Sequence, residues 1–199
     1  MSLLALKPSP SLASNLMGNA NQTHVNNFLL ILAGSVLIAL SAQVAIRLPF
    51  TPIPVTGQTF AILMVGMALG SKRGALAVVA YLLEGAAGLP VFAGGTGGLL
   101  ALMGPTSGFL LGFIPAAYIT GYLAEHGWDR NVLTTGLAML IGNAMIYIPG
   151  LIVLGTILGT TPSTTIKFGF LPFYMGDLVK LALAAVMMPM AWKFINKGK

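Results

Sequence analysis

The residues best suited to chemistry lie near the start of the last long apolar run, in the segment GDLVKL at 176–181. Asp177 and Lys180 are three positions apart, a spacing at which a helix places both side chains on one face. A charged side chain inside a spanning helix costs about 2.5–3.5 kcal/mol, so a retained one generally faces a partner, a cavity or a ligand. We therefore predict a ligand site built on this acid and base. The alternative is that they only pair with each other and hold a helix bundle together.

The composition of the 199-residue chain is not that of an ordinary soluble domain. Hydrophobic residues make up 56% and charged residues only 7%, with a mean hydropathy of +0.90, whereas soluble domains carry about 25% charged residues. The net charge of +6 comes mainly from bases in short connections. No basic stripe with interleaved aromatics is present, so we expect a lipid bilayer and no nucleic acid as partner.

The sequence gives no support for a metal site or for catalysis. The chain has no cysteine, and its two histidines, His24 and His126, lie far apart in polar connections. No predicted span holds a histidine that could activate a serine nucleophile. We therefore expect no metal, no cofactor and no enzymatic activity.

The apolar runs predict an all-α membrane protein with six transmembrane helices. Residues 1–25 are polar and are expected to form a disordered tail, followed by a single six-helix domain over residues 26–199. The first run has 19 residues and no charge, close to the roughly 20 that a bilayer core requires. The predicted spans cover residues 28–46, 55–71, 74–92, 99–124, 132–158 and 168–192.

The distribution of Lys and Arg predicts that both termini are cytoplasmic. This orientation leaves only Arg47 and Lys167 on the external side, in agreement with the positive-inside rule. Asp177 and Lys180 then lie in the outer half of the membrane, just after the last external connection. The external connections 47–58 and 89–104 lie on the same side.

Further polar residues are expected at the same depth. Glu84 lies near the outward end of the third run, and Asn143 and Tyr147 lie one turn apart in the fifth. Three interpretations of Glu84 stay open: a ligand acceptor, a proton carrier, or an outer-end residue that reaches water. We predict that these unusual features converge on one outward-facing site.

A glycine-rich segment at 94–98 is the second candidate for ligand contact. Four glycines surround Thr96, and the absence of side chains lets backbone amides approach a ligand closely. The segment is neither a P-loop nor a dinucleotide fingerprint, because no Gly-Lys-Ser/Thr follows it and no strand precedes it. It is either a ligand lid or a plain flexible turn.

Small residues repeat at every fourth position in two of the runs. In the fourth run the repeat predicts close helix packing; its members are Gly104, Gly108, Gly112, Ala116, Thr120 and Ala124. In the first run the repeat suits either a contact within the bundle or docking of another membrane subunit; its pairs are Ser35 with Ala39 and Ser41 with Ala45.

Several spaced motifs resemble the BioY family: PFTPIPVTGQT at 49–59, LGSKRGALAVVAYLLEGAAGLPVFAGGTGG at 69–98, GPTSGFLLGF at 104–113 and GDLVK at 176–180. The likeness covers about residues 28–192. BioY is the biotin-specific S component, the substrate-capture subunit, of energy-coupling-factor (ECF) transporters. The resemblance implies a six-helix, multi-pass protein in the plasma membrane of a prokaryote that captures biotin from outside.

The resemblance also implies partners and a docking surface. Such a subunit delivers biotin through a transmembrane coupling protein and two ABC-type ATPases. The family's small-residue contact with the coupling protein lies on the first helix, which implies partner docking by Ser35, Ala39, Ser41 and Ala45 here.

Biotin suits the candidate side chains, because it combines a cyclic urea, a thioether ring and an acid tail. An ionised Asp177 can accept from the urea N–H groups, Asn143 can donate and accept, and Lys180 can pair with the carboxylate. Aromatic residues can wall the apolar ring. The other predicted ligand-binding residues are Gln58, Glu84, Phe92, Gly95, Thr96, Gly97, Tyr147 and Phe173.

Other functions stay open on the sequence alone. The chain could be an S component for another vitamin, such as thiamine. It could also be a self-sufficient secondary transporter that uses Glu84 or Asp177 as a proton site, or a purely structural membrane subunit. The sequence contains no nucleotide-binding motif, which favours a capture subunit energised by partners.

Overall fold

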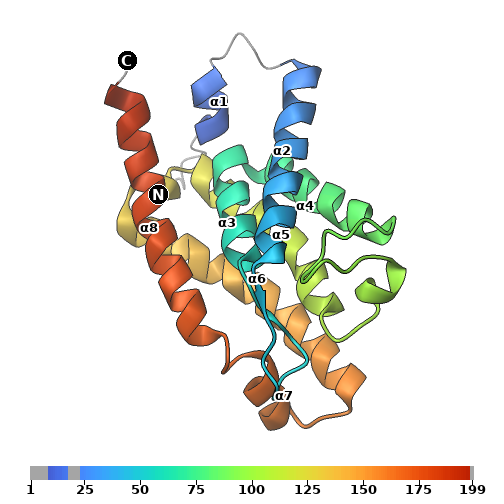
Figure 1. Ribbon diagram of the computed structural model, residues 1–199. Helices are drawn as coiled ribbons and strands as arrows, with labels where there is room; N and C mark the ends of the chain where they lie inside the picture. The colour runs from blue at the N-terminus through green and yellow to red at the C-terminus, as the bar shows by residue number, and fades with distance from the viewer. Residues whose placement is uncertain (1–8, 18–22, 198–199) are drawn as a thin grey trace, which may run out of the picture.

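The computed structural model describes residues 9–17 and 23–197, which form a bundle of helices with a β-hairpin at one end (Figure 1). Its elements in chain order are α1 (Leu12–Met17), α2 (His24–Gln43), β1 (Ala45–Ile46), β2 (Val55–Thr56), α3 (Gln58–Leu69), α4 (Ser71–Ala86), the 3₁₀ helix η2 (Leu99–Leu102), α5 (Ser107–Glu125), the 3₁₀ helix η3 (Trp128–Arg130), α6 (Val132–Leu158), α7 (Pro162–Gly169) and α8 (Tyr174–Lys197). Helix α5 lies at the centre, in contact with α3, α4 and α6.

Four of the described helices are long and apolar enough to cross a bilayer. They are α2 with 20 residues, α5 with 19, α6 with 27, and the 22 residues Tyr174–Ile195 of α8. Helix α6 has the bounds that the sequence predicts for the fifth span. Helices α3 and α4 have only 12 and 16 residues, so α3 is about 18 Å long, short of the roughly 30 Å bilayer core. Length therefore supports four of the predicted spans.

A proline-rich hairpin and a glycine turn set the ends of α2 and α3. Ala45–Ile46 pairs antiparallel with Val55–Thr56, because the prolines between them exclude a continuous helix. Gly70 is the only residue between α3 and α4, and its φ of +87° lies in the left-handed region that favours glycine. The first predicted span therefore ends and the second begins at the hairpin, and the chain reverses sharply before α4.

The small-residue repeat in α5 packs against neighbouring helices, as predicted. A Cβ added to Gly108 would lie 2.4 Å from the carbonyl oxygen of Pro149, and one on Gly112 would lie 2.8 Å from that of Met145. Ala116 and Thr120 are fully buried. Helices α5 and α6 therefore approach closely enough for glycine to be required at the contact.

Residues 9–17 are folded against the bundle, which corrects part of the predicted disordered tail. The hydroxyl of Ser9 donates to the carbonyl oxygen of Glu125 at 2.8 Å, and the guanidinium of Arg73 donates to Ser11 and Ser14. These polar partners fix α1 at the end of the bundle opposite the hairpin (Figure 1). The rest of the predicted tail lies in residues 1–8 and 18–22, outside the described residues, and in 23–25 at the start of α2.

The far end of α8 is anchored by a buried carboxylate. Asp129 in η3 is fully buried, and it accepts a hydrogen bond from the indole N–H of Trp192. The guanidinium of Arg130 lies over the same indole, 4.5 Å from its centroid. Burial raises the pKa of Asp129, and the hydrogen bond from Trp192 and the charge of Arg130 oppose that rise. These contacts hold α8 to the connection between α5 and α6.

Replacing Gly108 by Ala should lower the thermal unfolding midpoint of the purified protein in detergent. The added methyl group would clash with Pro149 and Val153, and such overpacking costs about 1–3 kcal/mol. Gly176→Ala is the matched control, because nothing lies within 4 Å of a Cβ added there. Equal losses in both variants would show that contact between α5 and α6 does not set the requirement for glycine.

Replacing Asp129 by Asn should stabilise the protein more at high pH than at low pH. Because folding raises this pKa, the native state holds the proton more tightly, and the wild type loses stability as the pH rises through the raised value. The Asn side chain does not titrate but can still accept from Trp192. We expect the variant's unfolding midpoint, relative to wild type, to increase between about pH 4 and about pH 8. A difference that is independent of pH would contradict this reasoning.

Candidate ligand-binding site

A cavity of about 410 Å³ lies between the β-hairpin connection, the glycine-rich segment and helices α5, α6 and α8. This volume falls within the roughly 300–1,000 Å³ of typical small-molecule sites. Its lining is largely apolar and aromatic, and it includes Ile53, Phe92, Phe109, Phe113, Ile146 and Phe173. Its polar lining includes Thr51, Thr56, Gln58, Thr59, Thr96, Thr106 and Tyr147, with the charged residues Arg47, Asp177 and Lys180.

The start of α8 positions the acid and the base. Pro172 precedes the helix, and Asp177 lies in its first turn, where the helix dipole favours a negative charge. The ammonium Nζ of Lys180 lies 3.0 Å from Oδ1 of Asp177. Both side chains therefore share one face of the helix, as their spacing predicts.

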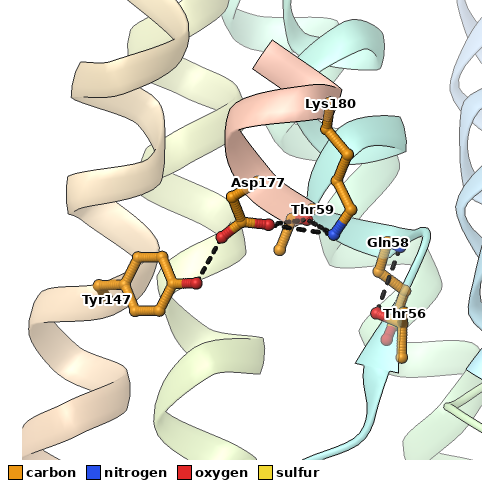
Figure 2. A network of polar contacts seen from close by, with 6 residues as sticks. All are labelled: Thr56, Gln58, Thr59, Tyr147, Asp177 and Lys180. Carbon is orange, nitrogen blue, oxygen red and sulfur yellow. Dashed lines mark hydrogen bonds and ion pairs between the residues drawn. The ribbon is translucent and has the colours of Figure 1, made fainter. Parts of the chain in front are cut away.

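Side chains from α3 and α6 complete a polar network around this pair (Figure 2). The phenol of Tyr147 on α6 donates to Oδ2 of Asp177. Lys180 also donates to the hydroxyl of Thr59 on α3 at 3.0 Å, and that hydroxyl lies 3.4 Å from Oδ1 of Asp177. Asp177 is 7% exposed, so the network holds an ion pair that is largely removed from water.

The aromatic wall is fixed by close contacts between α4 and Phe92, which lies just before the glycine-rich segment. Gly85 leaves room for the ring of Phe92, which would lie 2.0 Å from an added Cβ. Phe92 meets Tyr81 edge to face with ring centroids 5.4 Å apart, and Gln58 donates to the phenol of Tyr81 at 2.6 Å. The amide of Gln58 and the ring of Phe92 are therefore held in place before any ligand binds.

Seven of the predicted ligand-binding residues are brought together at the cavity. They are Gln58, Phe92, Thr96, Tyr147, Phe173, Asp177 and Lys180. Asp177 and Lys180 pair with each other and also line the cavity, so their role in ligand binding stays a prediction. The pairing changes the role expected for Lys180, since its charge is already balanced by Asp177.

Four predicted ligand-binding residues lie outside the cavity lining, and ligand contact by them stays a prediction. The carboxylate of Glu84 accepts from the hydroxyl of Ser35 at 2.6 and 2.7 Å, between α4 and α2. Gly95 faces Gln43. The position of a Cβ on Gly97 is occupied by the backbone of Leu89.

The fourth of these residues, Asn143, lies beside a much smaller hollow of about 10 Å³ behind the ion pair, which Thr59, Asp177 and Lys180 also line. Its side-chain oxygen is buried and has no hydrogen-bond partner among the described residues. Asn143 therefore adjoins the network without reaching the cavity.

The predicted docking residues on the first span divide between two environments. Ser35 is fully buried and bonded to Glu84, which supports the alternative of a contact within the bundle. Ser41 donates to the carbonyl oxygen of Ile38 at 2.6 Å. Ala45 lies in β1, beyond the end of α2, so Ser41 and Ala45 do not share a helix face. Ala39 is half-buried on α2, and docking by these residues stays a prediction.

Several lining residues were not predicted as ligand contacts. Thr59 directly follows Gln58, and its position at the start of an apolar run could have indicated a polar contact. Arg47 was predicted only to be a base outside the membrane, although it is the one cation of the connection between the first two apolar runs. Phe109 carries no signal that separates it from a lipid-facing or core aromatic residue.

The described helices include four candidate membrane spans. Between the helices lies a largely apolar cavity whose lining includes the ion pair of Asp177 and Lys180. These features are those of a membrane protein that can hold a small ligand. A family model described as the BioY family matches residues 14–197. The chain therefore belongs to the BioY family.

Individual relatives agree with this assignment. The biotin transporter BioY of Rhizobium etli is 39% identical over 165 residues, which cover 78% of this chain and 87% of the relative. The biotin transporter BioY of Thermotoga maritima is 42% identical over 154 residues, which cover 75% of this chain and 86% of the relative. The fold also matches a crystal structure of the S-component for biotin from an ECF-type ABC transporter. That match has a TM-score of 0.78 and 26% identity, and covers 87% of this chain and 94% of that chain.

The ion pair should show coupling between its two members in a double-mutant cycle. Lys180→Ala leaves the carboxylate of Asp177 without its counter-ion at 7% exposure, which should cost about 1–3 kcal/mol. The double variant Asp177→Asn/Lys180→Ala removes both charges and should therefore be more stable than Lys180→Ala alone. Thermal unfolding of the ligand-free protein measures this, and simply additive losses would contradict the coupling.

Proposed function

We propose that this chain is the membrane-embedded S component of an ECF-type transporter, which captures biotin from outside for ATP-driven uptake by partner subunits. The observation that carries the proposal is the Asp177–Lys180 pair at the buried part of the cavity, in a chain whose relatives are named biotin transporters. We propose no catalytic role for any residue, because capture requires binding alone.

The unused bonding capacity of the ion pair suits a cyclic urea. A carboxylate offers about four acceptor sites and an ammonium three donors. Among the described residues, Lys180 uses two donors, on Thr59 and Asp177, and Oδ2 of Asp177 accepts from Tyr147 alone. A urea N–H can therefore donate to Asp177 while the urea carbonyl accepts from Lys180. This assignment moves Lys180 from the ligand's carboxylate to its urea.

We propose that all six helices α2, α3, α4, α5, α6 and α8 lie in a prokaryotic plasma membrane with both termini cytoplasmic. The charge distribution supports this orientation. Arg73 meets α1, and Arg130 meets the end of α8, at the end of the bundle opposite the hairpin (Figure 1). Among the described bases outside the proposed membrane helices, Arg47 and Lys167 alone lie toward the hairpin and α7. The larger number of bases then faces the cytoplasm.

Partners must supply the energy, because the sequence has no nucleotide-binding motif. We propose a transmembrane coupling protein and two ABC-type ATPases, in keeping with the ECF-type structural neighbour. Helix α2 is the proposed docking element, because many of its large apolar side chains are exposed, including Leu32, Val36 and Leu40. Ala39 can contribute to that contact, whereas Ser35 is already engaged by Glu84.

Two substitutions in the ion pair should weaken binding of biotin to the purified protein by at least about tenfold each, equivalent to roughly 1.4 kcal/mol. Asp177→Asn removes the charged acceptor, and Lys180→Ala removes the donor. The matched control is Glu84→Gln, another acid-to-amide change, which lies outside the cavity and should leave the affinity unchanged. Isothermal titration calorimetry in detergent measures all three, and unchanged affinity in both site variants would refute the assignment.

A second experiment separates the proposal from its rivals. Native mass spectrometry of the purified chain should detect a retained ligand of the mass of biotin, whereas a mass of thiamine would identify another vitamin. Liposomes that contain only this chain should bind biotin without accumulating it. Accumulation driven by a proton gradient would instead support a self-sufficient transporter, and absence of any binding would support a structural subunit.

A further inference from the structure

Arg47 is a cation at the cavity that has no side-chain partner among the residues that the structure describes. It follows β1 on the connection between α2 and α3, it is exposed, and it lines the cavity. Among the described residues, which include all four acids of the chain, no side chain forms an ion pair or a hydrogen bond with its guanidinium. An arginine in this position has its full set of donors available.

The charges of the cavity leave an excess of one positive charge. Its lining contains three charged residues, Arg47, Asp177 and Lys180. Asp177 and Lys180 lie 3.0 Å apart and neutralise each other, so the remaining charge is that of Arg47. The buried part of the cavity is therefore suited to a neutral polar group, and the part near Arg47 is suited to an anion.

The glycine-rich segment passes close to this guanidinium. Nη2 of Arg47 lies 3.4 Å from the position that a Cβ on Gly94 would occupy, and Gly94 has a φ of +68°, which favours glycine. The amide N–H of Gly94 donates to the carbonyl oxygen of Ala42 at 3.4 Å. The loop therefore passes close to Arg47 without covering it with a side chain.

We propose that Arg47 binds the carboxylate of the ligand and makes the site selective for an anionic vitamin. The inference rests on the proposed function, and it adds the residue that binds the charged tail of the ligand. An aliphatic carboxylic acid is ionised near neutral pH, and a guanidinium can hold it with two parallel N–H···O bonds. The ligand then lies with its urea at the ion pair and its acid tail toward Arg47.

The test compares biotin with biotin methyl ester, which keeps the ring system and loses the charge. Affinities are measured by calorimetry on the full chain, purified from cells grown without added biotin. Wild type should bind biotin at least about tenfold more tightly than the ester. Arg47→Gln should lose that preference through weaker binding of biotin, with the affinity for the ester unchanged. Arg47→Lys should keep part of the preference, because it retains the charge but not the planar fork.

The control variant is Lys167→Gln, which removes an exposed external base in α7 that does not line the cavity. It should retain the full preference for biotin. Added salt should reduce the preference of wild type, because it screens an exposed charge. Equal affinity of wild type for acid and ester, or an unchanged preference in Arg47→Gln, would overturn the role of Arg47 while leaving the proposed function intact. Failure of wild type to bind either compound would overturn both.

Discussion

An acid and a base held in a low-dielectric environment set the main constraint on this structure. A single unpaired charge there is costly, so Asp177 and Lys180 must remain together and their remaining bonds must be satisfied. The network draws Tyr147 from α6 and Thr59 from α3 to the start of α8. Three elements that are distant in sequence are thereby fixed at one point (Figure 2), and the cavity forms where they meet.

Close backbone contacts make that meeting possible. Lipid tails are as apolar as a leucine side chain, so the hydrophobic effect does not drive helices together inside a membrane. The helices associate instead through close packing of small residues. Helix α5 does this on two sides. A Cβ on Gly121 would lie 2.5 Å from the backbone of Gly70, and one on Gly108 would lie 2.4 Å from that of Pro149. The central helix thus brings the turn between α3 and α4, and also α6, close to itself.

The sequence predicted features that depend on one helix and missed those that depend on how helices face each other. Spacing placed Asp177 and Lys180 on one face and identified the packing repeat of α5. Spacing also placed Asn143 with Tyr147, yet only Tyr147 reaches the cavity, because four residues displace a side chain by about 6 Å along the axis. The small-residue pattern of α2 likewise has no direction, so it did not reveal that Ser35 faces Glu84 inside the bundle. The hairpin that carries Arg47 was read as a connection, because two-residue strands leave no periodic signal.

The two parts of the cavity are held together with different strength. Around the ion pair, the bonds of Asp177 with Tyr147 on α6 and of Lys180 with Thr59 on α3 join three helices. The wall formed by the hairpin and the glycine-rich segment lies in exposed connections, which are tied mainly by backbone bonds such as Gly98 to Gly85 at 2.7 Å and Gly94 to Ala42 at 3.4 Å. Exposed connections with few buried apolar contacts open locally at lower free energy than a packed bundle. We therefore expect the region around the ion pair to keep its structure, and the wall that carries Arg47 to open at a lower cost in free energy.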